Sequence, residues 1–173
     1  ALQLFGQFVR FSLGLDELDG RTLVEQPQWR ERVQPDFIRY LRPDEELSQA
    51  HGERIRGETR VNADGTLDIS SWPRPQHDGI ATRALTLLRW LRLSTLEPAL
   101  RESAAHLLQA DLNYIRRHWQ QACYDIWEED LGLHYYSLCT AAAALGDDPA
   151  CAAIHQMLDG FWDEHRGHYR SRV

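Results

Sequence analysis

The sequence contains no lysine, few cysteines and no long apolar run, and each absence excludes a class of protein. All 19 basic residues are arginines and they stand against 26 acidic residues, so the formal net charge over 173 residues is −7. Because nucleic-acid binders gain affinity by neutralising phosphates with basic side chains, this balance argues against nucleic acid as a partner. No stretch of about 18 apolar residues is present, so no membrane span is predicted.

The three cysteines, Cys123, Cys139 and Cys151, are odd in number and lack the C-x-x-C spacing. This pattern predicts neither a disulfide framework nor a zinc site, and we expect all of them to be small core residues. The chain begins at Ala1 without a methionine or a charged leader. We therefore expect that Ala1 is not the native start, and the compartment stays open between cytoplasm and periplasm.

Apolar residues at three- and four-residue steps predict helices in the second half of the chain. The clearest pattern covers residues 98–121, and a second covers residues 79–93, with Asp78 expected to cap its free amides. A third helix is expected to begin at Asp148 and Pro149 and to run toward Gly167, after a preceding helix that ends at Gly146. The fold class predicted is all-α, built from helical hairpins.

The first half of the chain has weaker helical patterns and more glycine and proline. Weaker helical patterns cover residues 2–12 and 28–42, and the second contains Pro35, which fits best in a first helical turn. Residues 51–78 are rich in glycine and proline and predict one long irregular loop, in which the turn at residues 64–65 closes a small hairpin. Long ordered loops often carry function, so this loop is a candidate functional segment.

The end of this loop is the first stretch with chemical potential. Two prolines hold the backbone extended and present Trp72 and Arg74 stiffly, just before Asp78 and the next helix. An aromatic ring covers the apolar face of a sugar while arginine and carboxylate bond its hydroxyls, so the combination suits sugar binding. The alternative is that Trp72 fills the core and Asp78 only caps the helix.

The second stretch is the acidic run of residues 124–130, which follows the clearest helix. Carboxylates at the C-terminal end of a helix oppose its macrodipole, so something must compensate for them. Crowding, and contact with an indole such as that of Trp127, would raise the pKa of at least one carboxyl of this run. A carboxylic acid of that kind can protonate a leaving-group oxygen. The alternative is a solvated acidic cluster on the surface.

Together, these stretches resemble the glycoside hydrolase family that contains glucoamylase, glycoside hydrolase family 15. That family has a Trp-Gly-Arg-Pro-Gln-x-Asp-Gly segment before one helix and a Tyr-Asp-Leu-Trp-Glu-Glu segment after the next. Here they read Trp-Pro-Arg-Pro-Gln-His-Asp-Gly at residues 72–79 and Tyr-Asp-Ile-Trp-Glu-Glu at residues 124–129. Their order and spacing agree with the family over about residues 52–130.

The resemblance implies a fold, a reaction and a set of site residues. The fold would be an (α/α)6 barrel, of which residues 1–173 form a single partial catalytic domain with residues 51–78 as its substrate-side loop. The reaction would release glucose from the chain ends of an α-linked glucan with inversion, without metal or cofactor. The implied roles are Glu128 as general acid, Glu129 as a ligand of sugar hydroxyls, Trp72, Ile126 and Trp127 along the cleft, and Asp125, Arg74 and Asp78 in support.

Two features of the family are missing from the sequence. An inverting hydrolase needs a second carboxylate to activate water, and in this family it comes from a segment later than residue 173. The family's Trp-Thr-Arg-Asp segment is also absent. We therefore expect the chain to be part of a larger protein whose remaining barrel is its partner. A non-catalytic glycan-binding or regulatory relative is the alternative, and a helical scaffold with a chance acidic run is a third. The preferred linkage, α-1,4, α-1,6 or trehalose-type, stays open.

Overall fold

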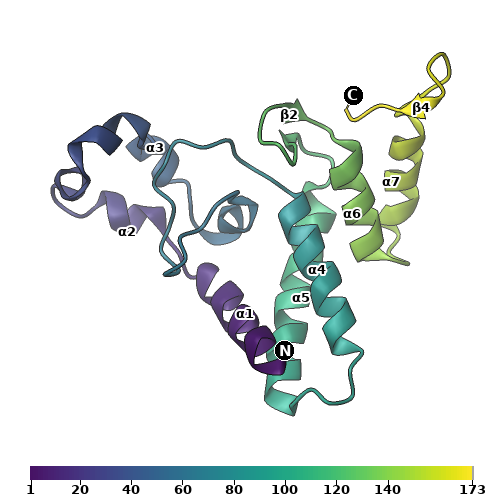
Figure 1. The fold of residues 1–173 in the computed structure, drawn as a ribbon, viewed down its shortest axis with the longest axis horizontal. Helices are drawn as coiled ribbons and strands as arrows, with labels where there is room; N and C mark the ends of the chain where they lie inside the picture. Colours follow the sequence, from purple (N-terminus) through teal and green to yellow (C-terminus); the bar gives the residue numbers. More distant parts are fainter. Residues whose placement is uncertain (173) are drawn as a thin grey trace.

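The computed structural model describes residues 1–172, and its regular structure is almost entirely helical. A block of packed helices lies beside an irregular lobe formed by the chain between α1 and α4 (Figure 1). The α-helices are α1 (Leu2–Leu15), α2 (Gly20–Val24), α3 (Asp44–Leu47), α4 (Asp78–Leu91), α5 (Pro98–His118), α6 (Tyr135–Leu145) and α7 (Ala150–Asp159). The 3-10 helices are η1 (Trp29–Arg32), η2 (Pro35–Tyr40) and η3 (Gly52–Gly57).

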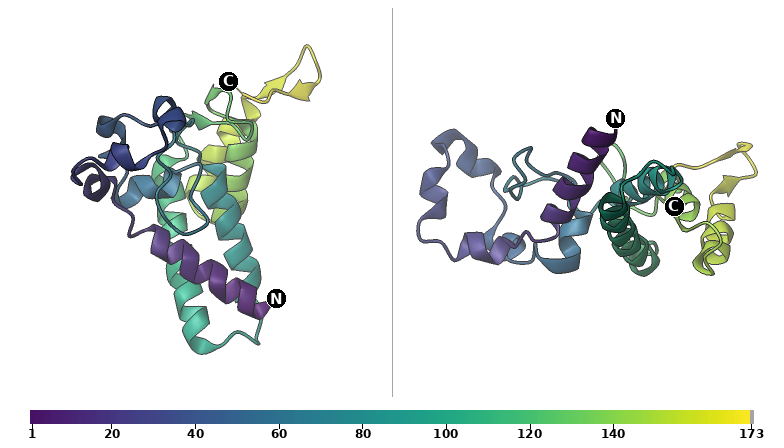
Figure 2. Two further views of the ribbon diagram at one scale, coloured as in Figure 1. Left: turned by 60° about the vertical axis from the view of Figure 1, so that its left-hand side comes forward. Right: turned by 90° about the horizontal axis from the view of Figure 1, so that it is seen from below.

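Helices α4 and α5 form a hairpin at the centre of the block. Helix α1 packs against α5, α6 packs against α4, and α7 packs against α6. Seen from below, α1, the α4–α5 pair and the α6–α7 pair follow one another across the molecule (Figure 2). The predicted all-α architecture of helical hairpins is therefore confirmed.

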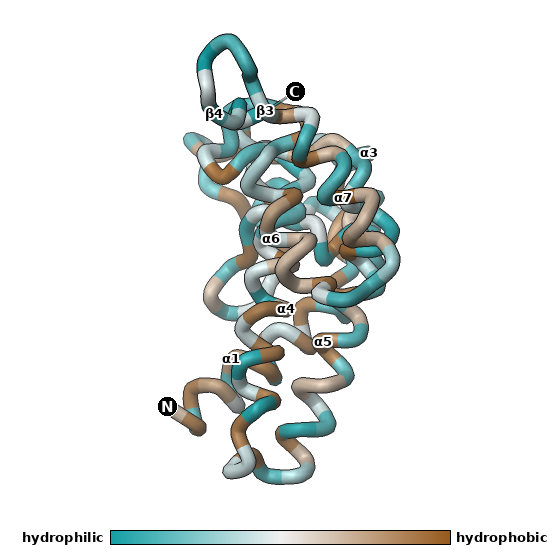
Figure 3. Tube along the Cα trace, turned by 90° about the vertical axis from the view of Figure 1, so that its right-hand side faces the viewer, coloured by the Kyte–Doolittle hydropathy of each residue, from teal (hydrophilic) through white to brown (hydrophobic). Residues whose placement is uncertain are grey.

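Apolar faces at helical spacing hold the block together. Leu87, Leu107 and Ile154 are completely buried, and Phe5 of α1 stacks on Trp90 of α4 with ring centroids 4.4 Å apart. The hydropathy tube shows apolar segments within α4 and α5, whereas the tip between β3 and β4 is hydrophilic (Figure 3). The prediction from periodicity holds because these helices bury one apolar stripe each against a neighbour.

A buried carboxylate ties the lobe to the block. Asp111 of α5 is completely buried and accepts hydrogen bonds from Arg83 of α4, at 2.8 Å (Nε) and 2.6 Å (Nη2), and from Arg56 of η3, at 2.6 Å. Arg56 also contacts the carboxylate of Asp16, just after α1. One carboxylate with two arginines therefore joins three helices, and an ion pair continues the connection to α1.

Two of the predicted helices are wrong in extent. The helix expected over residues 148–167 ends at Asp159, because Gly160 takes the C-cap position and Phe161 turns into the core, where it is completely buried. Strands β3 (Trp162–Asp163) and β4 (His168–Tyr169) then pair antiparallel. Residues 28–42 form the 3-10 helices η1 and η2 instead of one α-helix, with Pro35 at the start of η2 as expected.

The expected helix cap and loop hairpin have mixed outcomes. Asp78 does not cap α4, since His77 takes the N-cap position and Asp78 lies in the first turn. A carboxylate there still interacts favourably with the helix dipole. In the loop, Val61 bridges Leu67 antiparallel around Gly65, whose φ is +83°, so the predicted hairpin is confirmed. The loop also contains η3, which the sequence pattern did not indicate.

Candidate active site

The two stretches singled out in the sequence lie side by side in the structure. Strands β1 (Cys123–Tyr124) and β2 (Leu131–Gly132) pair into a short hairpin whose tip carries the acidic residues. The Tyr124 amide donates to the Pro75 carbonyl at 2.9 Å, and the Gln76 side-chain amide donates to the Asp125 carbonyl at 3.1 Å. The end of the long loop is thus joined to the acidic hairpin by two hydrogen bonds.

Trp72 and Glu128 are in direct contact at this junction. The indole Nε1 of Trp72 donates to Glu128 Oε2, across a separation of 56 residues in sequence. Trp72 keeps 41% of its surface exposed, and the Arg60 guanidinium lies 4.6 Å from the centre of its ring. Glu128 has a φ of 61°, in the left-handed region that few non-glycine residues adopt. The acidic side chain therefore stands at an exposed hairpin tip, held by an indole from another segment.

Asp125 organises the hairpin tip. Its Oδ1 accepts from the Glu129 amide at 2.8 Å and the Asp130 amide at 3.3 Å, and its carbonyl accepts from the Glu128 amide at 2.9 Å. Desolvation acts to raise the pKa of Asp125, but these backbone amides outweigh it and the pKa is lowered. We expected crowding to raise the pKa of at least one carboxyl in this run, but the pKa of Asp125 is not raised. Its carboxylate remains charged and accepts hydrogen bonds from the amides of the tip.

The acidic run is not a helix end, contrary to what the sequence suggested. Helix α5 stops at His118, and Arg116, Arg117 and His118 in its last turn complement the dipole. The hairpin follows after a short connection, because β1 begins only at Cys123.

Trp127 and Ile126 project from the tip into solvent. Trp127 is 75% exposed and Ile126 is 43% exposed. Glu128 is contacted by the indole of Trp72 and not by that of Trp127. The exposed ring of Trp127 is therefore available to contact a ligand. Exposed aromatic and aliphatic surface beside a carboxylate is an arrangement that suits the apolar faces of a sugar.

The two supporting residues of the first motif are both largely buried. Arg74 donates to the carbonyls of Ser70 at 3.1 Å and Trp72 at 2.7 Å, so it braces the loop. Asp78 is 8% exposed, and its Oδ1 has no hydrogen-bond partner within residues 1–172. Burial raises the pKa of Asp78. Neither side chain is free to face a ligand at the hairpin tip.

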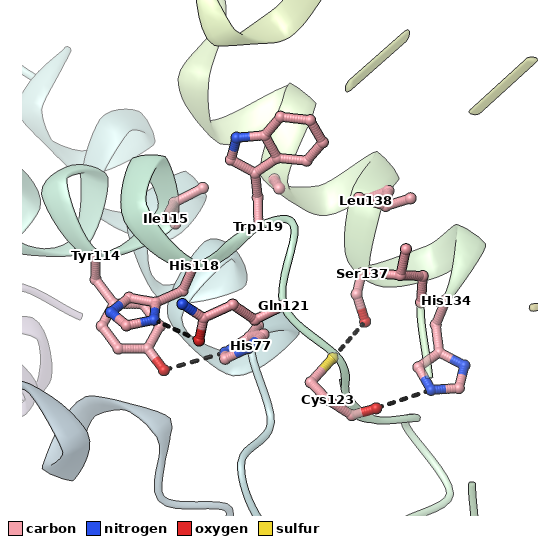
Figure 4. Close-up of a pocket in the computed structure, with 12 residues that line it drawn as sticks. His77, Tyr114, Ile115, His118, Trp119, Gln121, Cys123, His134, Ser137 and Leu138 are labelled. Carbon is pink, nitrogen blue, oxygen red and sulfur yellow. Dashed lines mark hydrogen bonds between the residues drawn. The ribbon is translucent and has the colours of Figure 1, made fainter. Parts of the chain in front are cut away.

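A small enclosed cavity lies between the end of α5, β1 and α6 (Figure 4). His77 and Tyr114 both line this cavity, and His77 Nδ1 lies 3.0 Å from the Tyr114 hydroxyl. Burial, and to a smaller extent the nearby His118, lower the pKa of His77 to about 4. The cavity measures about 20 Å³, which suits roughly one water molecule and excludes a glucose unit. This cavity is therefore too small to be a sugar site.

Sequence reasoning missed a set of buried charged residues behind Trp72. Arg42, Glu58 and Asp68 form ion pairs with one another or with Arg74. Single charged residues scattered through an irregular loop form no periodic pattern. The only hint was the exclusive use of arginine, whose planar fork favours fixed bidentate contacts.

Comparison with known proteins places the chain in a family. The pattern of the family described as Glycosyl hydrolases family 15 matches residues 43–159. A probable glucoamylase of Schizosaccharomyces pombe is 31% identical over 140 residues, covering 68% of this chain and 31% of that protein. Glucoamylase 1 of Rhizopus oryzae is 33% identical over 94 residues, covering 47% of this chain and 14% of that protein.

Solved structures agree in fold. The family 15 glucoamylase from Hypocrea jecorina superposes with a TM-score of 0.68 at 19% identity, covering 98% of this chain and 27% of that one. A glucoamylase from Saccharomycopsis fibuligera gives a TM-score of 0.63 at 18% identity, covering 99% of this chain and 37% of that one.

The chain therefore spans about a third or less of the curated relatives named above. Of the helices within residues 1–172, none combines the length and apolar character that a membrane crossing requires. Its helices correspond to one part of the (α/α)6 barrel of glucoamylases. With its family pattern covering residues 43–159, the chain belongs to glycosyl hydrolase family 15.

Proposed function

We propose that the whole protein carrying this chain is an inverting, exo-acting α-glucosidase of the glucoamylase type, with Glu128 as its general acid. The observation that carries the proposal is the contact between the Trp72 indole and the Glu128 carboxylate. It brings together one residue from each of the two sequence motifs. A general acid must be held in one orientation beside the leaving group, and the indole supplies that constraint.

The neighbouring residues have roles that fit this chemistry. Glu128 would donate its proton to the glycosidic oxygen as the bond to the sugar breaks. Glu129 would accept hydrogen bonds from sugar hydroxyls, and the exposed surfaces of Trp127, Ile126 and Trp72 would contact the apolar faces of the glucose units.

Behind these residues, a second group would hold the tip in place. Asp125 keeps the hairpin tip ordered through its hydrogen bonds to the tip amides. Arg74 and Asp78 would support the loop and the start of α4.

The rest of the barrel would complete the site. We propose that residues 1–173 form a single partial catalytic domain and that residues 51–78 lie on its substrate side. The carboxylate that activates water would come from a segment outside this chain, as would further groups that hold the terminal glucose. The substrate class proposed is an α-linked glucan or oligosaccharide.

Replacement of the acid tests this proposal in the full-length protein. Glu128→Gln removes the proton donor but keeps the shape of the side chain, so glucose release from maltose or starch should fall by roughly 10² to 10⁴-fold. Glu102→Gln on the exposed face of α5 is the matched control and should keep the wild-type rate. A Glu128→Gln protein that hydrolyses at the wild-type rate would refute the assignment.

Calorimetric titration separates an enzyme from a non-catalytic relative. A binding protein would hold a malto-oligosaccharide unchanged, and the titrated sugar could be recovered intact. An enzyme would convert it to glucose during the titration. Recovery of intact sugar from the full-length wild-type protein would overturn the proposed hydrolysis and favour the binding role.

A further inference from the structure

Four charged side chains form a buried network behind Trp72. The exposed fractions of the Arg42, Glu58, Arg74 and Asp68 side chains are 3%, 5%, 9% and 11%. Glu58 lies at the centre, because its carboxylate accepts from Arg42 Nη1 at 3.0 Å and Nη2 at 3.2 Å and also contacts Arg74 Nε. Each of these charges is thus paired inside the lobe.

Arg74 connects this network to the backbone of Trp72. Its Nη1 donates to the carbonyls of Ser70 and Trp72, and its Nη2 donates to Asp68 Oδ2 at 2.8 Å. The guanidinium is therefore enclosed by three acceptors from the turn that leads into Trp72. A planar fork with several fixed partners sets the path of this turn more strictly than a single hydrogen bond could.

The segment around Arg42 pairs with the same turn from the other side. The Arg42 amide donates to the Ile69 carbonyl at 2.9 Å, and the Ser71 amide donates to the Tyr40 carbonyl at 2.6 Å. On the far side of Trp72, the Thr59 hydroxyl donates to the Pro73 carbonyl at 2.6 Å. The backbone is fixed immediately before and after Trp72, while the indole itself points out to Glu128.

We propose that Glu58, together with Arg42, is a positioning residue of the site. Through Arg74 it fixes the backbone of Trp72 so that the indole reaches Glu128. The catalytic meaning of this role rests on the proposed function, although the geometric part does not. Buried ion pairs often add little net stability compared with apolar packing. A network of this kind is therefore better explained by the geometry that it imposes on Trp72 than by stabilisation alone.

A second buried network provides a matched control. Asp111 is paired with two arginines, as Glu58 is, but its partners Arg83 and Arg56 join α4, α5 and η3. The control is stringent because Arg56 lies only two positions before Glu58 in the sequence. If Glu58 acted only by stabilising the fold, neutralising Glu58 and neutralising Asp111 should change the environment of the Trp72 indole to the same extent.

The indole N–H signals of nitrogen-15 labelled protein test the geometric claim directly. Trp72→Phe identifies the Trp72 signal by its disappearance from the spectrum. Glu58→Gln should move this signal upfield or broaden it, because the hydrogen bond to Glu128 is loosened. Asp111→Asn should leave it in place. An unmoved Trp72 signal in folded Glu58→Gln, or an equal displacement in both variants, would overturn the proposal.

A second variant covers the case in which Glu58→Gln fails to fold. Arg42→Lys keeps the charge but loses the bidentate fork, so it should shift the Trp72 signal in the same direction by a smaller amount. No displacement in folded Arg42→Lys would contradict the role of Arg42.

Kinetics of the full-length protein give an independent reading of the same role. Glu58→Gln should lower kcat about tenfold, which is the size of effect expected from weakening one hydrogen bond in the transition state, with a smaller change in KM. A change in KM alone would contradict a role in orienting the acid. If the wild-type protein releases no glucose, the proposed function fails, yet the displacement of the Trp72 signal still decides the geometric claim.

Discussion

The helical block and the irregular lobe differ in how much they rely on apolar packing and on buried ion pairs. In the block, apolar residues such as Leu87, Leu107 and Ile154 are fully buried between helices. The lobe has a smaller apolar core, around Trp29, Leu47 and other residues, and adds buried arginine–carboxylate pairs centred on Glu58. Apolar packing tolerates small shifts, whereas a paired charge network requires each partner in place. The half of the chain that presents Trp72 is thus the half with the stricter geometry.

Removal of the central carboxylate should give the largest effect. Glu58→Ala removes the carboxylate that Arg42 and Arg74 share, and leaves only Glu46 to Arg42 and Asp68 to Arg74 as carboxylate partners. We therefore expect a loss of about 3 kcal/mol, the lower end of the cost of breaking a buried ion pair. Hydrogen exchange should show the lobe opening while α4 and α5 stay protected. Glu45→Ala, on the exposed side of α3, is the control. A loss of less than about 1 kcal/mol would mean that water replaces the partner at low cost and that the lobe is not held by this network.

A cavity in the block should lower the stability of the whole chain. Leu107 is completely buried between α5 and its neighbours, so Leu107→Ala should reduce the free energy of unfolding by about 3 kcal/mol. Protection should fall throughout the block in hydrogen exchange, unlike the local opening expected for Glu58→Ala. Gln109→Ala, which is exposed on the same helix, should change little. A purely local effect of Leu107→Ala would erase the contrast between the two regions.

Acid should weaken the junction where the two regions meet. His77 lies at the start of α4, and burial lowers its pKa to about 4. Its pKa in the unfolded chain is about 6.5, so the unfolded state binds more protons between these values. Its contribution to stability is complete above about pH 6.5 and falls by about 2 to 3 kcal/mol as the pH drops toward 4.

Denaturant unfolding of His77→Gln between pH 4 and 7 measures this contribution. The variant should show a smaller slope of stability against pH in that window than the wild type. His165→Gln, an exposed histidine near the β3–β4 tip, should keep the wild-type slope. Equal slopes in His77→Gln and wild type would show that other groups control the acid response.

The β3–β4 tip should be the least sensitive part. Gly167 has a φ of +68°, and a side chain in that region costs about 1–2 kcal/mol locally. The tip is exposed and hydrophilic, so Gly167→Ala should fray the hairpin and lower overall stability by about 1 kcal/mol or less. Thermal unfolding checks this value. A large fall in stability would mean that the hairpin contributes to the core more than its exposure indicates.

The comparison also explains what could be predicted from the sequence. The helices of the block could be predicted from the spacing of their apolar residues, because each helix buries one apolar stripe. Gly146 correctly predicted the end of α6. The end of α7 was missed because the apolar pattern continues through Phe161 and Trp162 after the helix has stopped at Asp159. A single glycine within a continuing pattern is a weak stop signal.

The candidate site was predictable only as two separate motifs. Their resemblance to a family named Trp72 and Glu128, but no local pattern indicates that an indole and a carboxylate 56 residues apart form a hydrogen bond. The network around Glu58 has no periodic pattern in the sequence, since Arg42 and Arg74 lie 16 residues before and after Glu58. Long-range polar contacts in irregular segments depend on the whole fold, so they appear only in the structure.

One measurement tests the assignment of Glu128 most directly. Proton NMR of the full-length protein acting on maltotriose resolves the first anomer of glucose released and its rate. The wild type should release β-glucose, because inversion at an α-linkage gives the β anomer, and Glu128→Gln should release little glucose. Initial formation of α-glucose, or β-glucose released at the wild-type rate by Glu128→Gln, would contradict the assignment.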